Sequence, residues 1–536
     1  MTNRTNRKLT PTIAAALVAA FSLMQVQAAR AVTRRPALVV GIMVDGLSMD
    51  YIELLRDQFA QNGFRRLLEN GLTINDLDYG TWVDPAAATG IIYTGASPDV
   101  NGVAGATVYD RDARRSKSVF FDASTLGNYT TETLSPGALT SSTLADEVRI
   151  DGGGVAYAYS IAPEPAEAII MAGHAGNSAF WINDATGRWA TTTFYKDLPA
   201  PPQEANRRAP LDRRLDTLQW VPSIPVDRFP DLPAHKKLYP FRNIFQRGNT
   251  NRFRAYKNSP AVNADVTDMA ADYIRVLQLG KRDATDMLSL GLTVQPYLYG
   301  RDPDNRVELM DSYLRLDRDL ARLFDAIDRH GPGMDRTLVF VAGTPLTRRQ
   351  RRDDEKWAVP FGEFSSRKAV SLLNMYLMAL YGNGDWVSGY HEGQIYLNHN
   401  LIKERGKDLD EIRRESARFL TRMAGVQHAW SVDDVIDRRA GDNPDAIRRN
   451  TSLATAGDVF LSIAPGWQAT DDDSDTESAS TIVRAGAPTA PAFILGPDVK
   501  ARTVESPVDA RVLAPTVAGI LRIRAPNGAA QPRIRP

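Results

Sequence analysis

An uninterrupted apolar run near the start of the chain constrains the fold more than any other feature of the sequence. Residues 37–44 read ALVVGIMV, and a strand without alternating polar positions is typical of a parallel sheet that is covered on both faces. Asp45 and Gly46 end the run, and Ser48 is placed to cap the helix that follows. A strand, a polar turn and a helix form the opening of a parallel α/β unit.

The same order of elements recurs along the chain. One apolar face marks a helix over residues 313–327, and Gly331 ends it. Further strands are predicted at residues 337–342, 458–463 and 492–495, and a proline at position 515 fits the first turn of a final helix. We therefore predict an α/β fold in which a mostly parallel central sheet has helices on both faces.

The chain has 536 residues, more than a single compact domain usually contains. We divide it into a leader at 1–28, the first part of an α/β core at 29–364, an inserted α+β subdomain at 365–438 and the completion of the core at 439–536. Within the core, residues 197–216 are rich in proline and charge, and this composition predicts a solvated loop.

The N-terminal segment has the pattern of a secretory signal peptide. Arg4, Arg7 and Lys8 precede an apolar run at residues 13–24, and residues 26–28 (VQA) supply a small-residue cleavage site. The apolar run is too short to span the roughly 30 Å hydrocarbon core of a bilayer. We expect an exported protein, periplasmic or associated with the envelope, that is not an integral membrane protein.

Overall composition narrows the classes of partner. The 64 basic and 64 acidic residues cancel, so no net field draws the protein toward nucleic acid. The chain has no cysteine, which excludes disulfides and thiolate metal sites. The identity of the partner stays open, with an anionic ligand or an envelope protein as the two candidates.

A set of longer strings points to a known family. They occur in order between residues 38 and 522 and read VVGIMVDG, GFRRLLENG, IIYTGASPDVNGVAG, AIIMAGHAGNSAFW, DSYLRLDRDLARLFDAID, GDWVSGYHEGQIYLN and VLAPTVAGILRI. Together they resemble the alkaline phosphatase and type I phosphodiesterase/nucleotide pyrophosphatase superfamily, and within it the phosphate-irrepressible bacterial phosphatases with a single-threonine nucleophile. The resemblance implies an alkaline phosphatase-like fold.

The resemblance also implies a reaction and a set of site residues. Members hydrolyse phosphate esters with a threonine or serine nucleophile and two zinc ions, which stabilise the attacking and leaving oxygens. Carried onto this chain, the first metal aspartate matches Asp45, whereas the nucleophile falls on Pro85, which has no hydroxyl. The remaining substrate and metal positions fall on Ala106, Glu164, Ala166, Val294, Leu298, Gly343, Thr344 and a position near Thr489.

Asp45 is therefore expected to be the one metal-type residue retained, without partner ligands. Its alternative role is structural, because an aspartate after a strand also caps a turn such as the one through Gly46 to Ser48.

An arginine run is the one feature of the sequence that suggests a replacement site. Arg348, Arg349, Arg351 and Arg352 follow the predicted strand at 337–342, and four guanidiniums there form a possible anion-binding site for phosphate, sulfate or an acidic glycan. The alternative is a solvated run that the acidic residues at 353–355 neutralise.

Our first hypothesis from the sequence is an exported pseudoenzyme, in which the phosphatase-like scaffold serves binding or scaffolding and needs no cofactor. The alternative is a hydrolase of phosphate or sulfate esters with a rearranged site around Asp45, Asp84, Thr89 and His174, for which the family implies two zinc ions. A third hypothesis is a metal-free anion-binding module that uses the arginine run.

Overall fold

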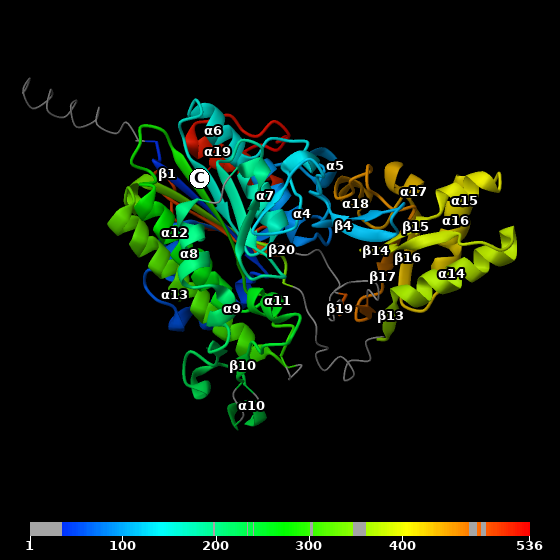
Figure 1. The fold of residues 1–536 in the computed structure, drawn as a ribbon, viewed down its shortest axis with the longest axis horizontal. Helices are drawn as coiled ribbons and strands as arrows, with labels where there is room; N and C mark the ends of the chain where they lie inside the picture. The colour runs from blue at the N-terminus through cyan, green and yellow to red at the C-terminus, as the bar shows by residue number, and fades with distance from the viewer. Residues whose placement is uncertain are drawn as a thin grey trace, which may run out of the picture.

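A mixed sheet of eleven strands forms the centre of the larger part of the molecule (Figure 1). The computed structural model describes residues 35–196, 199–232, 234–238, 241–300, 304–346, 361–470, 480–483 and 489–535. In spatial order the strands are β21 (Arg502–Val504), β2 (Leu72–Asp78), β20 (Thr489–Leu495), β12 (Thr337–Gly343), β1 (Leu38–Asp45), β11 (Asp286–Thr293), β6 (Ala158–Ile161), β7 (Ser178–Ile182), β8 (Trp189–Thr192) and β5 (Gly127–Asn128), and β22 (Val508–Asp509) pairs with β2.

The predicted α/β fold class is confirmed. The five strands from β12 to β7 run parallel, while β20 is antiparallel to both of its neighbours. The first apolar run forms β1 between β11 and β12, and its residues from Leu38 to Val44 are buried. Burial on both faces explains why this strand has no polar alternation.

Helices cover the two faces of this sheet, and each face has its own apolar core. Val40 and Ile42 of β1 pack into one core, and Val39 and Met43 pack into the other. The first core is closed by α2 (Met49–Leu55), α3 (Phe64–Asn70), α11 (Arg252–Lys257), α12 (Ala261–Val276) and α13 (Arg306–His330). The second is closed by α4 (Pro85–Thr94), α6 (Leu144–Asp151), α7 (Pro165–Ala172) and α19 (Leu513–Leu521).

A smaller part of the molecule lies beside this core, on the right of Figure 1. Its antiparallel sheet has the order β14 (Val387–His391), β15 (Gln394–Leu397), β17 (Val459–Ile463) and β16 (Val426–Ser431), and a three-stranded sheet contains β13 (Glu363–Ser365), β18 (Gln468–Thr470) and β19 (Ser480–Ile482). Both sheets contain strands that precede residue 438 in the sequence and strands that follow it, although the sequence suggested a boundary at that residue. Its helices are α14 (Ser366–Tyr381), α15 (His399–Glu404), α16 (Leu409–Leu420), α17 (Val432–Ile436) and α18 (Pro444–Arg449).

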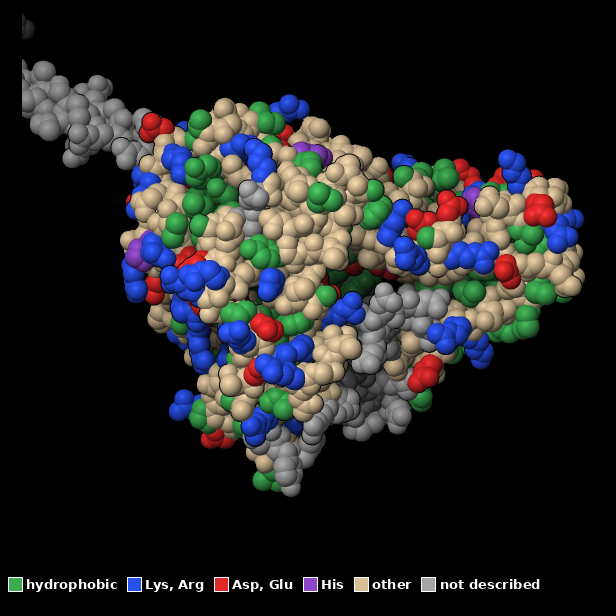
Figure 2. Space-filling view, viewed as in Figure 1, with side chains coloured by type: hydrophobic (Ala, Val, Ile, Leu, Met, Phe, Trp, Pro, Cys, Tyr) green, Lys and Arg blue, Asp and Glu red, His purple; other side chains and the backbone are tan. Residues whose placement is uncertain are grey.

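The subdomain is held on a hairpin of the core, formed by β3 (Thr107–Asp110) and β4 (Arg115–Ser118). The Tyr109 hydroxyl donates to the carbonyl of Ser388 at 2.6 Å. Arg111 Nη1 donates to the fully buried Asp458 carboxylate at 2.6 Å. Figure 2 shows the molecular surface hollowed between the core and the subdomain.

The Asp458 carboxylate contacts two arginines and a histidine at this junction. His399 Nε2 lies 2.8 Å and Arg413 Nε 3.0 Å from its carboxylate. Burial alone would raise the pKa of Asp458, but the contacts with His399 and Arg111 hold it well below the usual range. The buried carboxylate is therefore fully compensated, and it ties the subdomain to the core.

The prediction of a loop at residues 197–216 is wrong, because most of this segment is helical. Helices α8 (Ala200–Arg208) and α9 (Leu211–Arg214) occupy most of it. Pro201 and Pro202 lie in the first turn of α8, where a missing backbone N–H costs nothing, so the prolines begin a helix instead of preventing one.

Some predicted features lie outside the described residues. These are the leader at 1–28 and the arginines Arg348, Arg349, Arg351 and Arg352. Among the described residues, no helix is long and apolar enough to cross a bilayer.

Two aspartates of the subdomain each pair with an arginine of the hairpin, and we expect their replacement to reduce the unfolding free energy by unequal amounts. Replacing Asp458 with alanine leaves Arg111 and Arg413 without their buried partner and is expected to cost about 3 kcal/mol of unfolding free energy. Asp385→Ala removes an exposed pair with Arg114 at 3.5 Å and should cost less than about 1 kcal/mol. Urea unfolding followed by tryptophan fluorescence measures both; equal losses would contradict the role given to Asp458.

Candidate active site

Asp45 is the last residue of β1, at the carboxyl edge of the parallel strands. It lies opposite Thr293 of β11, and the neighbouring Val44 lies opposite Gly343 of β12. The three strand ends are therefore adjacent. Ligands of open α/β sheets bind outside this edge, which makes it the place to look for reactive side chains.

The Asp45 carboxyl has two partners at this edge. The Thr344 hydroxyl donates to Asp45 Oδ1 in a short hydrogen bond, and Gln295 Nε2 donates to the same oxygen at 3.1 Å. The Gly46 N–H donates to Thr344 Oγ1 at 3.0 Å, and the Ser48 N–H to the Tyr313 hydroxyl at 2.8 Å. Because those amides bond elsewhere, Asp45 is not the cap of the following turn.

The pKa of Asp45 is raised to about 6, because burial disfavours its charged form more than the bonds from Thr344 and Gln295 favour it. Asp45 is only half-buried, so part of its surface still meets solvent. A carboxyl with these properties is ionised at neutral pH and can accept a proton from a nearby group.

Asp84 and Pro85 begin α4 at the same edge. Asp84 Oδ1 accepts hydrogen bonds from the N–H of Ala86 at 2.8 Å and of Ala106 at 3.0 Å. Burial raises the pKa of Asp84 although these amides oppose the shift. Pro85 is the first helical residue, and the buried Thr89 hydroxyl donates to its carbonyl at 2.8 Å. Neither Pro85 nor Thr89 therefore presents a free nucleophilic group.

Two acidic residues of the α7 region complete the cluster. Glu167 is 8% exposed, and a Cβ placed on Gly291 of β11 would lie 2.8 Å from its Oε2. Burial, followed by the charges of Asp45, Glu164 and Asp84, raises the pKa of Glu167 well above its usual value. The same environment thus disfavours the charged form of Glu167 strongly, and the charge of Asp45 contributes to this shift.

Lys257 is the cation described beside these carboxyls. It is buried, and its Nζ lies 2.9 Å from Glu164 Oε2 and 2.5 Å from Asp184 Oδ1. Burial would lower the pKa of Lys257, but these two carboxylates raise it. The ammonium group is thus charged and neutralises Glu164 and Asp184 in part.

The subdomain brings a further carboxyl to the edge. The turn between β14 and β15 has positive φ at both Glu392 (45°) and Gly393 (79°). A Cβ placed on Gly105 would lie 2.9 Å from Glu392 Oε2 and 3.7 Å from Asp84 Cβ, so both acids flank one glycine. The neighbouring His391 anchors the turn, because its ring nitrogens lie 3.2 Å from Thr107 Oγ1 and 3.1 Å from Ser116 Oγ.

His174 does not join this cluster. Its ring nitrogens lie 3.4 Å from Asp146 Oδ2 and 3.1 Å from the Leu139 carbonyl. The bond with Asp146 raises the pKa of His174. The residue therefore closes a contact between α6 and the end of α7.

The donors at this edge do not fit a pair of zinc ions. The positions that would supply the further ligands hold a buried valine (Val294), a glycine (Gly343) and two threonines, of which Thr344 bonds Asp45 and Thr489 bonds Asp76 at 2.8 Å. Across the described ranges, no three His, Cys, Asp or Glu side chains are arranged to hold one ion.

The sequence pattern indicated Asp45 but missed most of this cluster. Thr344 was noted only because a metal-ligand position of the family falls on it. No sequence pattern distinguishes the other residues, which are Gln295, Glu167, Lys257 and Glu392. No local sequence motif identifies these residues, because their side chains come together only after the strands, α7 and the subdomain have packed.

The chain matches the model of one protein family over residues 39–488, the type I phosphodiesterase / nucleotide pyrophosphatase family. A "calcium-transporting ATPase" of Myroides odoratus is 27% identical, over 92% of this chain and 93% of that protein. Alkaline phosphatase PafA of Elizabethkingia meningoseptica is 25% identical over 92% of this chain and 93% of that protein. Alkaline phosphatase PhoV of Synechococcus elongatus is 26% identical over 92% of this chain and 91% of that protein. The crystal structure of wild-type PafA covers 94% of this chain with a TM-score of 0.82 at 23% identity.

These relatives contradict the hypothesis of an exported pseudoenzyme with a binding or scaffolding role. Proteins named as alkaline phosphatases align with more than nine tenths of this chain. The hypothesis failed because it counted residues only at the family positions. At another position, Glu167 of α7 contributes a buried carboxyl beside Gly291 of β11, which pairs with Met43, two residues before Asp45.

The contacts of Asp45 make one prediction about its titration. Thr344→Val removes a hydrogen bond that lowers the pKa of Asp45, so this pKa should rise above about 6. Carboxyl ¹³C NMR of aspartate-labelled protein measures the shift. Thr489→Val removes a hydroxyl that donates to Asp76 instead of Asp45, and it is the matched control. An unchanged Asp45 titration in Thr344→Val would show that the hydroxyl does not act on the carboxyl.

Proposed function

Because the chain belongs to the type I phosphodiesterase / nucleotide pyrophosphatase family of the alkaline phosphatase superfamily, we propose that it hydrolyses phosphate esters at the carboxyl edge beside Asp45. The observation that carries the proposal is the pair of unlike carboxyls there, Asp45 and Glu167. Burial raises the pKa of both groups, to about 6 for Asp45 and well above its usual value for Glu167, and we assign the role of base to Asp45 and the role of acid to Glu167. Such separated pairs are the usual arrangement for acid–base catalysis.

Asp45 is the general base of the proposed reaction. Its ionised carboxylate accepts a proton from a water molecule while that water oxygen attacks the phosphorus atom. The half-buried position leaves access for water. Thr344 and Gln295 hold the carboxylate in one orientation through Oδ1, which leaves Oδ2 for the proton.

Glu167 is the general acid. Its neutral carboxyl donates a proton to the oxygen of the leaving alcohol as the phosphorus–oxygen ester bond breaks. The products are the alcohol and inorganic phosphate. Transfer of the proton from Asp45 back to Glu167 through solvent restores both groups, so protons and bonds balance over one turnover.

The remaining groups determine the electrostatics of the edge. Lys257 supplies positive charge but shares it with Glu164 and Asp184. Glu392 reaches the edge from the subdomain, beside Asp84. This arrangement differs from the two-zinc chemistry that the family implies, and no step above passes through zinc.

The proposal predicts a large loss of activity in Asp45→Asn. Removing a general base lowers kcat by about 100-fold or more, measured as release of p-nitrophenol from p-nitrophenyl phosphate. In the unaltered protein kcat/KM should fall as the pH drops through about 6, because Asp45 then becomes protonated.

Asp110→Asn is the matched control for this experiment. Asp110 is the last residue of β3 in the β3–β4 hairpin, where its carboxylate accepts from Lys117 at 2.8 Å, so its replacement should leave turnover unchanged. Full activity of Asp45→Asn, or turnover that persists unchanged well below pH 6, would contradict the role of Asp45.

A further inference from the structure

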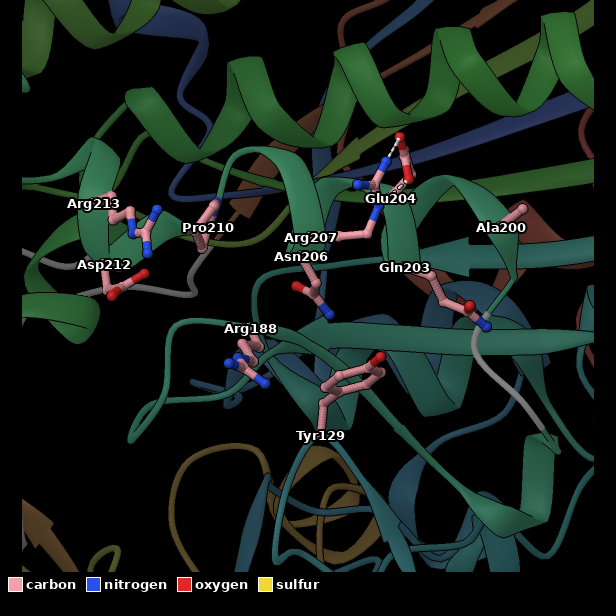
Figure 3. A pocket seen from close by; sticks show the side chains of 10 residues that line it. All are labelled: Tyr129, Arg188, Ala200, Gln203, Glu204, Asn206, Arg207, Pro210, Asp212 and Arg213. Atoms are coloured by element: carbon pink, nitrogen blue, oxygen red, sulfur yellow. Dashed lines mark hydrogen bonds and ion pairs between the residues drawn. The ribbon is translucent and has the colours of Figure 1, made fainter.

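A polar cavity lies between α8, α9 and the turn that joins β7 to β8, and Asp45 does not line it. Its volume is about 800 Å³. Figure 3 shows side chains that line it, among them Tyr129, Arg188, Gln203, Arg207 and Arg213. None of them belongs to the carboxyl cluster. The segment at 200–214, whose charge has no part in the proposed hydrolysis, forms one wall of this cavity.

Two of the arginines that line the cavity form no ion pair with the described residues. Arg207 is paired, since its Nε and Nη2 lie 2.9 and 2.7 Å from the Glu204 carboxylate. Arg188 and Arg213 have no carboxylate partner in the described part of the chain. Figure 2 shows Lys and Arg side chains gathered over α8 and α9. Two guanidiniums with free donors are suited to a carboxylate, phosphate or phosphonate group.

An aromatic ring lies beside these cations. Tyr129 is 40% exposed, and the Arg188 guanidinium carbon is 5.8 Å from the centroid of its ring. The backbone of Tyr129 has a φ of 62°, a conformation that residues with a Cβ rarely adopt. Such conformations persist where the surrounding structure fixes a side chain in a required direction, which is common at ligand sites.

We propose that this cavity binds a small anion that carries a planar aromatic ring. The anionic group accepts hydrogen bonds from Arg188 and Arg213, and the ring packs on the exposed side of Tyr129. Asp212, which also lines the cavity, disfavours ligands with acidic groups on both ends. Recognition thus requires both parts of the ligand, the charge and the ring.

The test uses the full chain and three probes in isothermal titration calorimetry. Phenylphosphonate carries both parts and has a carbon–phosphorus bond that hydrolysis of an ester would not cleave. Methylphosphonate carries the charge alone, and benzyl alcohol carries the ring alone. Phenylphosphonate should bind at least 10-fold more tightly than either. Absence of phenylphosphonate binding, or equal binding of methylphosphonate, would overturn the proposal.

Single-residue variants test whether phenylphosphonate binds in this cavity. Arg213→Gln and Tyr129→Asn should each weaken phenylphosphonate binding at least 10-fold, and asparagine tolerates the left-handed backbone at position 129. Arg208→Gln is the matched control, because Arg208 lies on α8, pairs with Glu204 and does not line the cavity.

Two further measurements show whether phenylphosphonate binds in this cavity or at the carboxyl edge. Thermal unfolding midpoints of the variants should match that of the unaltered chain, so a loss of binding does not arise from unfolding. Asp45→Asn should leave the Arg213-dependent part of phenylphosphonate binding unchanged, because Asp45 does not line the cavity. Loss of binding in Asp45→Asn, with full binding in Arg213→Gln, would assign the ligand to the carboxyl edge and overturn the proposal.

Discussion

The structure depends on the position of one buried strand. Because β1 is enclosed between β11 and β12 and covered by an apolar core on each face, it places Asp45 at the sheet edge with little freedom to move. Thr344 and Gln295 then orient the carboxyl. Burial at the end of this strand also raises the pKa of the carboxyl. Fold stability and site chemistry therefore have a common origin.

The charged residues at this edge of the sheet differ from those that the family resemblance implies. Where the resemblance implies two zinc ions, this chain has carboxyls from β1, α4, α7 and the subdomain, with the Lys257 ammonium group beside Glu164. Desolvation opposes this accumulation of negative charge, since burial raises the pKa of carboxyls such as Glu167. The subdomain contributes through the strained turn at Glu392, which is held in place by His391 and by the buried Asp458 at the junction.

The sequence was sufficient for the main features of the fold. The apolar run before Asp45 predicted a doubly covered parallel strand, and Gly331 correctly ended the long helix α13. It failed at residues 197–216, where proline in a first helical turn was taken as a sign of a loop. It also failed for the function, because Thr344, Glu167 and Glu392 lie far apart in the chain. Their meeting depends on strand order and on subdomain docking, which no local pattern encodes.

The most direct test of the proposed chemistry is the initial rate of p-nitrophenyl phosphate hydrolysis by purified protein before and after extensive treatment with a zinc chelator. A reaction carried by Asp45 and Glu167 does not require the zinc pair for which the described donors are unsuited. We predict measurable turnover whose rate the chelator leaves unchanged. A rate that the chelator abolishes and added zinc restores, or no turnover at all, would contradict the role given to these two carboxyls.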